Sequence, residues 1–307
     1  MQHFGRQLVW GFILGLFSIC LAHSAKSQVL QNYRLEVLSY NVKGLPWPVG
    51  TVNGKSAKKR CKLIGEELAE LRRLGTAPQV VVLQEMMVED CDQLLIRSGY
   101  PHSYWQVKEE GRTYGTGLAF LSEFPLQGLQ KILYGNNCSG TDCWAHKGVI
   151  GVKVTIPELP EPVAIVTTHL QAGRENDDIR LKQMDQMIGE FLPLMGVSHL
   201  VQIFAGDFNS KPSRPSYDYF LNLSGLFDAG QVCLKSTLSC QSVFGGRSEP
   251  ENIWEDTHDR QFFHVPSASV LRMFPTQVLL RFSGDPVLGP ELSDHFGYQV
   301  DYIISWP

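Results

Sequence analysis

The feature that most constrains the fold is a series of short apolar segments, several of which end in polar side chains. They cover residues 35–40, 79–83, 148–154, 163–168, 200–205 and 298–304. Their length and their β-branched residues predict strands, and residues 35–40 alternate as a half-buried strand does. The sequence therefore predicts that β-sheet supplies much of the core.

Two other segments, residues 56–74 and 178–195, carry apolar side chains at helical spacing. Ser56 can cap the start of the first segment and Gly75 can end it. Both are amphipathic, so each is expected to cover a sheet. We find no repeat, low-complexity block or linker, and a single α/β domain from about residue 28 to residue 307 is the simplest organisation.

Residues 1–24 are typical of a signal peptide. Arg6 is the only charged residue of this segment, residues 8–21 are almost entirely apolar, and a small-x-small pattern ends at Ser24. We expect cleavage near Ala25, which leaves a catalytic domain at residues 25–307 of a secreted protein, either extracellular or periplasmic. An uncleaved anchor is the alternative, although the apolar stretch is short for a membrane span.

The cysteines predict disulfide bonds. The chain has seven cysteines, and six remain once Cys20 leaves with the signal segment. An even number in an exported protein favours disulfides, and there is no Cys-x-x-Cys pattern to suggest zinc. Two pairs that are close in the sequence are expected to close local bridges, and this leaves the third pair: Cys138–Cys143, Cys233–Cys240 and Cys61–Cys91.

Acidic, amide and imidazole side chains follow the predicted strands. A single residue of this kind at a strand end is more often a turn former or a helix cap. Their joint occurrence is more informative, because strands that end in such groups deliver them to one rim of a sheet. The set comprises Asn41, Glu85, His169, Asp207, Asn209, Asp294 and His295.

Five motifs in a fixed order carry a resemblance to a known family. They are Ser-Tyr-Asn at 39–41, Leu-Gln-Glu at 83–85, Thr-His-Leu at 168–170, Gly-Asp-Phe-Asn at 206–209 and Ser-Asp-His at 293–295. The chain resembles the endonuclease/exonuclease/phosphatase superfamily, which includes pancreatic deoxyribonuclease. The resemblance implies a four-layer α/β sandwich of two mixed β-sheets flanked by helices, the DNase I-like fold. It also implies a divalent metal, usually Mg²⁺, for which Mn²⁺ or Co²⁺ could substitute.

The chemistry of phosphodiester hydrolysis suits these side chains. Glu85 offers the hard oxygen that Mg²⁺ prefers, with Asn41 in support and Asp294 as a further metal ligand or its neighbour. His295 is the candidate general base, because imidazole titrates near working pH. In the family a carboxylate orients this histidine, and Asp259 is the best match here, although Asp-Arg-Gln departs from the usual motif.

Three further residues complete the expected catalytic set. The resemblance assigns Asp207 and Asn209 to orienting the water or the phosphate. His169 would donate to the phosphoryl oxygens as negative charge builds.

One segment points to a subgroup of the superfamily. Asp142 and Lys147, five residues apart before a Gly-Val strand, resemble a stretch of neutral sphingomyelinases, as does Tyr-Asn-x-x-Gly-Leu-Pro at 40–46. The implied reaction is hydrolysis of sphingomyelin to ceramide and phosphocholine. Asp142 and Lys147 would bind substrate, with Lys147 contacting the phosphate from a solvated loop.

A lipid substrate implies contact with a membrane surface, and we expect Trp47 and residues 270–282 to provide it. No obligate protein partner is predicted. The alternatives are a secreted nuclease, a phosphatase of inositol phosphates or phosphoinositides, and a catalytically silent binding module. The formal net charge of −4 and the lack of a clear basic groove weigh against nucleic acid. The presence of every polar residue of the expected site weighs against a catalytically silent protein.

Overall fold

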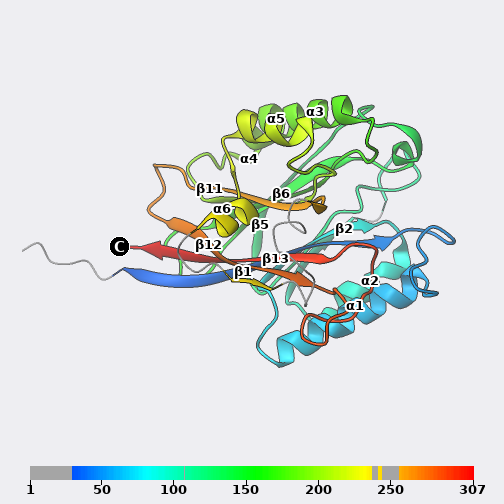
Figure 1. The fold of residues 1–307 in the computed structure, drawn as a ribbon, viewed down its shortest axis with the longest axis horizontal. Helices are drawn as coiled ribbons and strands as arrows, with labels where there is room; N and C mark the ends of the chain where they lie inside the picture. The colour runs from blue at the N-terminus through cyan, green and yellow to red at the C-terminus, as the bar shows by residue number, and fades with distance from the viewer. Residues whose placement is uncertain (1–29, 107, 237–240, 244–255) are drawn as a thin grey trace, which may run out of the picture.

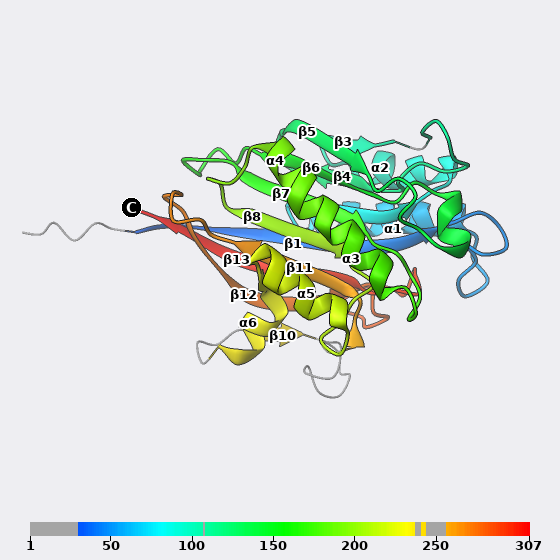
Figure 2. The ribbon, with the colours of Figure 1, turned by 90° about the horizontal axis from the view of Figure 1, so that it is seen from above.

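Two mixed β-sheets packed face to face form the centre of the protein (Figures 1 and 2). The computed structural model describes residues 30–106, 108–236, 241–243 and 256–307. Helices α1 (Ala57–Arg73) and α2 (Asp92–Ser98) cover one sheet, and α3 (Asp177–Gln186) and α5 (Pro215–Ser224) cover the other. The expected four-layer sandwich is confirmed.

Within the described residues, one sheet has seven strands and the other has six. The seven-stranded sheet has the order β10 (Gln241–Val243), β12 (Arg272–Arg281), β13 (Gly297–Trp306), β1 (Gln31–Gly44), β2 (Val80–Met86), β4 (Ala119–Ser122) and β3 (His102–Trp105). The six-stranded sheet has the order β5 (Leu126–Leu133), β6 (Gly148–Val154), β7 (Val163–His169), β8 (Gln202–Asp207), β11 (Asp259–His264) and β9 (Phe227–Asp228).

Both predicted amphipathic helices are present. The Ser56 side chain accepts a hydrogen bond from the backbone of Lys59 and so caps α1 as expected. The second segment continues from α3 through a π-helical turn (Met187–Phe191) into α4 (Leu192–Met195), where Gly196 ends it in the left-handed conformation. The short helix α6 (Ala229–Lys235) packs beside β11 and β12.

The main core lies between the two sheets. It joins β-branched residues of β1, β2, β7, β8 and β13, among them Val37, Val82, Ile165, Ile203 and Val300, none of which is accessible to solvent. Such burial contributes roughly 25 cal/mol for each Å² of apolar surface removed from water. Because the central strands are covered on both faces, strands such as β2 and β7 begin with continuous apolar runs.

The predicted role of residues 270–282 in membrane contact is largely wrong. Most of this segment forms β12, and Leu271, Val278 and Leu280 are buried in the main core. Only Val270 and Phe274 leave large apolar side chains exposed there. The segment is apolar because it is a core strand, and apolar content alone does not distinguish the two cases.

Two predicted disulfides are confirmed. Cys61–Cys91 joins α1 to the 3₁₀ turn η1 (Glu89–Cys91), and Cys138–Cys143 closes a five-residue separation at η2 (Gly140–Trp144). The Cys233–Cys240 pair and the predicted signal segment include residues outside the described ranges, so both stay predictions. No helix in the described part of the chain is long and apolar enough to cross a membrane.

Strand register places the ends of several strands at one edge. Strands β7 and β8 are parallel, with His169 opposite Asp207, and β11 runs antiparallel to β8, with Asp259 opposite Asp207. In the other sheet β1 and β2 are parallel, with Asn41 opposite Gln84. Each sheet therefore presents a row of polar side chains at the same edge of the sandwich.

Candidate active site

Asn41 joins the polar rows of the two sheets. Its Nδ2 atom donates to Oε1 of Glu85 at 3.0 Å and to Oδ2 of Asp207 at 3.1 Å. Its Oδ1 atom accepts from the backbone of Lys43, which fixes the orientation of the amide. The side chain is fully buried, so this neutral group connects two carboxylates without adding charge.

Glu85 has the features expected of a metal ligand. Its backbone has a positive φ of 59°, a conformation that costs a non-glycine residue about 1–3 kcal/mol and is found most often at functional sites. Its Oε2 atom is buried without a hydrogen-bond partner. A buried carboxylate oxygen needs a compensating charge or donor, and a hard divalent cation fits that need.

His169 and Asp207 meet across neighbouring parallel strands. The Nε2 atom of His169 lies 3.4 Å from Oδ2 of Asp207 and 3.9 Å from Oε1 of Glu85. Burial, reinforced by the Lys147 charge, lowers the pKa of His169 and favours the neutral imidazole. Burial opposes ionisation of Asp207, but the nearby histidines and its hydrogen bonds outweigh it and hold the pKa of Asp207 at about 2.

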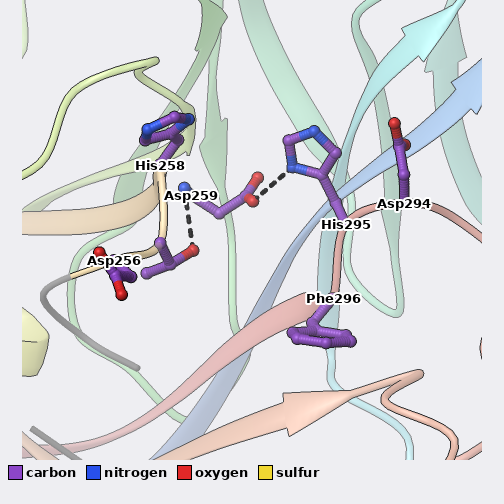
Figure 3. A pocket seen from close by; sticks show the side chains of 7 residues that line it. Asp256, His258, Asp259, Asp294, His295 and Phe296 are labelled. Atoms are coloured by element: carbon purple, nitrogen blue, oxygen red, sulfur yellow. Dashed lines mark hydrogen bonds and ion pairs between the residues drawn. The ribbon is translucent and has the colours of Figure 1, made fainter. Parts of the chain in front are cut away.

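His295 and Asp259 form a hydrogen-bonded pair at the same edge (Figure 3). The Nδ1 atom of His295 lies 2.7 Å from Oδ2 of Asp259, and its Nε2 atom faces Asp207 across 3.9 Å. Burial disfavours the charged imidazole, but the Asp259 carboxylate outweighs it and raises the pKa of His295. The expected pairing of these two residues is present, with Nε2 directed into the site.

The Asp207, Asp259 and His295 side chains also form a compact group that could hold a cation. However, His295 Nδ1 and Asp259 Oδ2 already bind each other, and Asp207 accepts hydrogen bonds from Asn41 and Asn209. Glu85 Oε2 and Asp259 Oδ1 are both buried without a hydrogen-bond partner, but the Asp259 carboxylate is already paired with the His295 imidazole. Glu85 is therefore the better candidate ligand.

Asn209 makes hydrogen bonds within the site, whereas Asp294 forms an ion pair with Lys43. Asn209, with a positive φ of 46°, donates from Nδ2 to the Leu170 carbonyl and from its backbone to Asp207. It therefore braces the loops after β7 and β8. Asp294 instead pairs with Lys43 at 2.6 Å, and it lies on the far side of His295 from Asp259 in Figure 3. Its predicted role as a metal ligand stays a prediction.

The Asp142–Lys147 pair lies against this site, but the expectation of a solvated lysine is wrong. Lys147 is only 4% exposed, and its Nζ atom lies 3.1 Å from Oδ2 of Asp142 and 3.2 Å from the Leu170 carbonyl. It directly precedes the buried strand β6, which draws it into the protein. Asp142, Lys147, Glu85 and His169 all line one cavity of about 200 Å³.

Two supporting residues were not assigned a role from the sequence. The Ser293 hydroxyl donates to the Asn41 carbonyl at 2.7 Å and so fixes the loop that carries His295. The buried Arg60 guanidinium donates to the carbonyls of Val42, Lys43, Gly50 and Leu292. Ser293 belongs to a recognised motif, but no sequence signal marks Arg60, since a lysine- and arginine-rich helix start is usually solvated.

The chain belongs to the endonuclease/exonuclease/phosphatase family, whose model matches residues 38–303. This match extends from β1 to β13 and includes every residue of the candidate site.

Two curated proteins are similar in sequence. The inositol phosphosphingolipids phospholipase C of Saccharomyces cerevisiae is 24% identical over 276 residues, 81% of this chain and 50% of that protein. The "Putative neutral sphingomyelinase" of Drosophila melanogaster is 25% identical over 207 residues, 64% of this chain and 43% of that protein. The chain thus spans about half the length of these relatives.

Solved structures share the fold. A Staphylococcus aureus beta toxin mutant with bound magnesium ions has a TM-score of 0.59 and 17% identity, over 89% of this chain and 99% of that chain. The D. rerio TDP2 complexed with a single-strand DNA product has a TM-score of 0.60 and 19% identity, over 88% of this chain and 98% of that chain. At these identities the likeness concerns the fold alone.

Proposed function

We propose that this protein hydrolyses sphingomyelin to ceramide and phosphocholine. The observation that carries the proposal is that Lys147 and Asp142 line the same cavity as Glu85 and His169. A lysine beside the site can supply a positive charge to a phosphate. The names of the two curated relatives, which concern sphingolipid phosphodiester cleavage, support the same substrate class.

In the proposed reaction Glu85 would hold Mg²⁺, for which Mn²⁺ or Co²⁺ could substitute, and Asn41 would support this metal site through its hydrogen bond to the Glu85 carboxylate. When bound, the metal polarises a phosphoryl oxygen and offsets growing negative charge. Asp259 would hold the Nδ1 proton of His295, so that Nε2 of the neutral imidazole can accept the proton of the attacking water.

The remaining side chains position the reactants. Asp207 and Asn209 orient the water or the phosphate, and His169 donates from Nε2 to a phosphoryl oxygen. Water attacks phosphorus as His295 takes its proton, the bond to the ceramide oxygen breaks, and the leaving alkoxide takes a proton from solvent water.

Membrane contact is part of the proposal, because the substrate lies in a bilayer. Trp47 is 83% exposed and Val49 is 61% exposed on the loop after β1, and Val49 lines the cavity that holds Glu85. Tryptophan favours the boundary between water and lipid, since its ring is apolar and its N–H is polar. Trp47→Ala should therefore reduce binding to sphingomyelin vesicles, measured by co-sedimentation.

One experiment tests the substrate class. The purified protein with Mg²⁺ is incubated separately with sphingomyelin liposomes, plasmid DNA and an inositol phosphate. Release of phosphocholine from the liposomes alone supports the proposal. Cleavage of plasmid DNA without lipid hydrolysis would favour the nuclease alternative, and release of inorganic phosphate would favour the phosphatase.

Export is also proposed, on the basis of the signal-like segment and the two disulfides. Disulfides persist in oxidising compartments outside the cytosol. Expression of the full chain with N-terminal sequencing of the exported product should find a start near Ala25. A product that stays with the membrane fraction and begins at Met1 would favour the uncleaved anchor.

A further inference from the structure

The cavity beside Glu85 and His169 is lined mainly by apolar and aromatic side chains. It has a volume of about 200 Å³. Drug-sized ligands occupy pockets of roughly 300–1,000 Å³, so this one suits a compact group better than an acyl chain. Its apolar lining comprises Leu45, Pro46, Val49, Met87, Tyr114, Trp144 and Ala145.

Backbone hydrogen bonds hold the two aromatic residues of this lining together. The Tyr114 backbone N–H donates to the Trp144 carbonyl at 3.1 Å, and the His146 N–H donates to the Tyr114 carbonyl at 3.1 Å. Arg112 donates to the Ala145 carbonyl at 2.8 Å, and Trp144 directly follows a disulfide-bonded cysteine. The two rings are therefore attached to a braced loop pair.

The acidic groups of the lining have other roles. Asp142 accepts from the Lys147 ammonium and from the Ala172 backbone at Oδ2, so its charge is already paired with a cation. Glu85 and His169 belong to the catalytic edge. An inositol ring would need many hydrogen-bond partners here, whereas a quaternary ammonium needs none and is attracted to aromatic faces.

We infer that Tyr114 and Trp144 bind the trimethylammonium group of the substrate and are specificity-determining residues. This inference rests on the proposed function. In phosphocholine two carbons separate the ammonium from the phosphate oxygen. Because Glu85, His169 and both rings line one cavity, that cavity can take the phosphate beside His169 and the methylated cation against the rings.

The first test measures binding without turnover. The full chain with Mg²⁺ is titrated calorimetrically with phosphocholine and with phosphoethanolamine. The wild type should bind phosphocholine more tightly. Tyr114→Ala and Trp144→Ala should each weaken phosphocholine binding about two- to thirtyfold, the range for one cation–π contact, and leave phosphoethanolamine binding nearly unchanged.

Two further variants complete this test. Trp144→Phe should restore most of the preference, because it keeps an aromatic face. Phe227→Ala, which removes an exposed aromatic side chain of β9, should bind as the wild type does. Trp144 is 63% exposed, so its truncation should not unfold the protein. Equal binding of the two ligands by the wild type, or full phosphocholine affinity in both alanine variants, would overturn the inference.

Soluble substrates separate this inference from the proposed function. The wild type should hydrolyse p-nitrophenylphosphocholine with a lower KM than ethyl p-nitrophenyl phosphate, and the two alanine variants should lose that difference. Equal KM values for the two esters would overturn the headgroup inference while phosphodiesterase activity stands. Hydrolysis of neither ester, together with inert liposomes, would overturn the proposed function, and the calorimetric preference would still decide the role of the rings.

Discussion

The imidazole Nδ1 atom of His295 lies 2.7 Å from the Asp259 carboxylate, although 36 residues separate the two in the chain. Asp259 is the first residue of β11, and His295 lies in the loop before β13. The two come from different sheets, so their contact depends on how the sheets are packed. Asp259 holds Nδ1 of His295, and Nε2 of the same ring faces Asp207. Among the histidines that the structure describes in this site, His295 alone has both contacts.

Asp259→Asn should slow hydrolysis about 10²- to 10⁴-fold, because an amide no longer stabilises the required tautomer or the imidazolium. The rate is measured with sphingomyelin liposomes and with a soluble phosphodiester, beside thermal melts. Asp185→Asn is the control, since Asp185 is a surface acid that accepts from the Tyr219 hydroxyl. A wild-type rate in Asp259→Asn would contradict the assignment of His295 as the oriented base.

Glu85→Gln should raise the Mg²⁺ concentration needed for half-maximal rate and leave the fold intact, because the amide lacks the charge that binds the metal. Chelation with EDTA should abolish wild-type activity, and added Mg²⁺ should restore it. Glu89→Gln, at a surface carboxylate that pairs with Lys108, should titrate as the wild type does. Full activity after exhaustive chelation would rule out the metal mechanism.

Lys147→Met should lower both stability and rate, because Lys147 is buried. Loss of the ammonium leaves the Asp142 carboxylate without its charged partner, at a cost of about 1–3 kcal/mol. The double variant Asp142→Asn/Lys147→Met also removes the Asp142 charge, so it should recover part of the lost stability, measured by thermal melts.

The same double variant tests whether the Asp142–Lys147 pair acts in hydrolysis as well as in stability. A lost charge-assisted contact to the phosphate corresponds to about a ten- to hundredfold slower rate. We expect this loss to persist in the double variant, whereas Lys58→Met, at an exposed ion pair with Asp90, should change neither quantity. Wild-type hydrolysis by the double variant would show that Lys147 serves stability alone.

Arg60→Met should destabilise the protein by about 2–4 kcal/mol, because it leaves several buried carbonyl oxygens without donors. These carbonyls include Val42 beside Asn41 and Leu292 beside Ser293. Urea unfolding of the variant measures the change, with Arg97→Met as a half-exposed control. An unchanged urea concentration at the unfolding midpoint would mean that water or another side chain donates to these carbonyls in place of the guanidinium.

Non-reducing peptide mapping should recover three bridges. Cys61–Cys91 and Cys138–Cys143 are present in the structure, and Cys233–Cys240 is expected from its spacing. A free thiol at Cys240 in the exported protein would contradict the third pairing.

Local patterns were sufficient to predict the central elements. Strand lengths, β-branched content and amphipathic spacing depend on neighbouring residues, so six of the central strands and both long helices were found, although β1 extends beyond its expected bounds at both ends. The motifs also marked Asn41, Glu85, His169, Asp207 and His295, which the structure brings to one edge. The apolar run at 270–282 shows the limit of this reasoning, because a core strand and a membrane-binding surface have similar composition.

Long-range packing decided what the sequence could not. The pairing of β8 with β11 places Asp259 beside Asp207, and the packing of the sheets then brings His295 to it. Lys147 is charged and loop-like in sequence, yet the strand after it and the Asp142 carboxylate make its burial possible. Burial and ion pairing depend on residues distant in the chain, so local composition determined the elements, and tertiary structure alone determined the environment of each catalytic group.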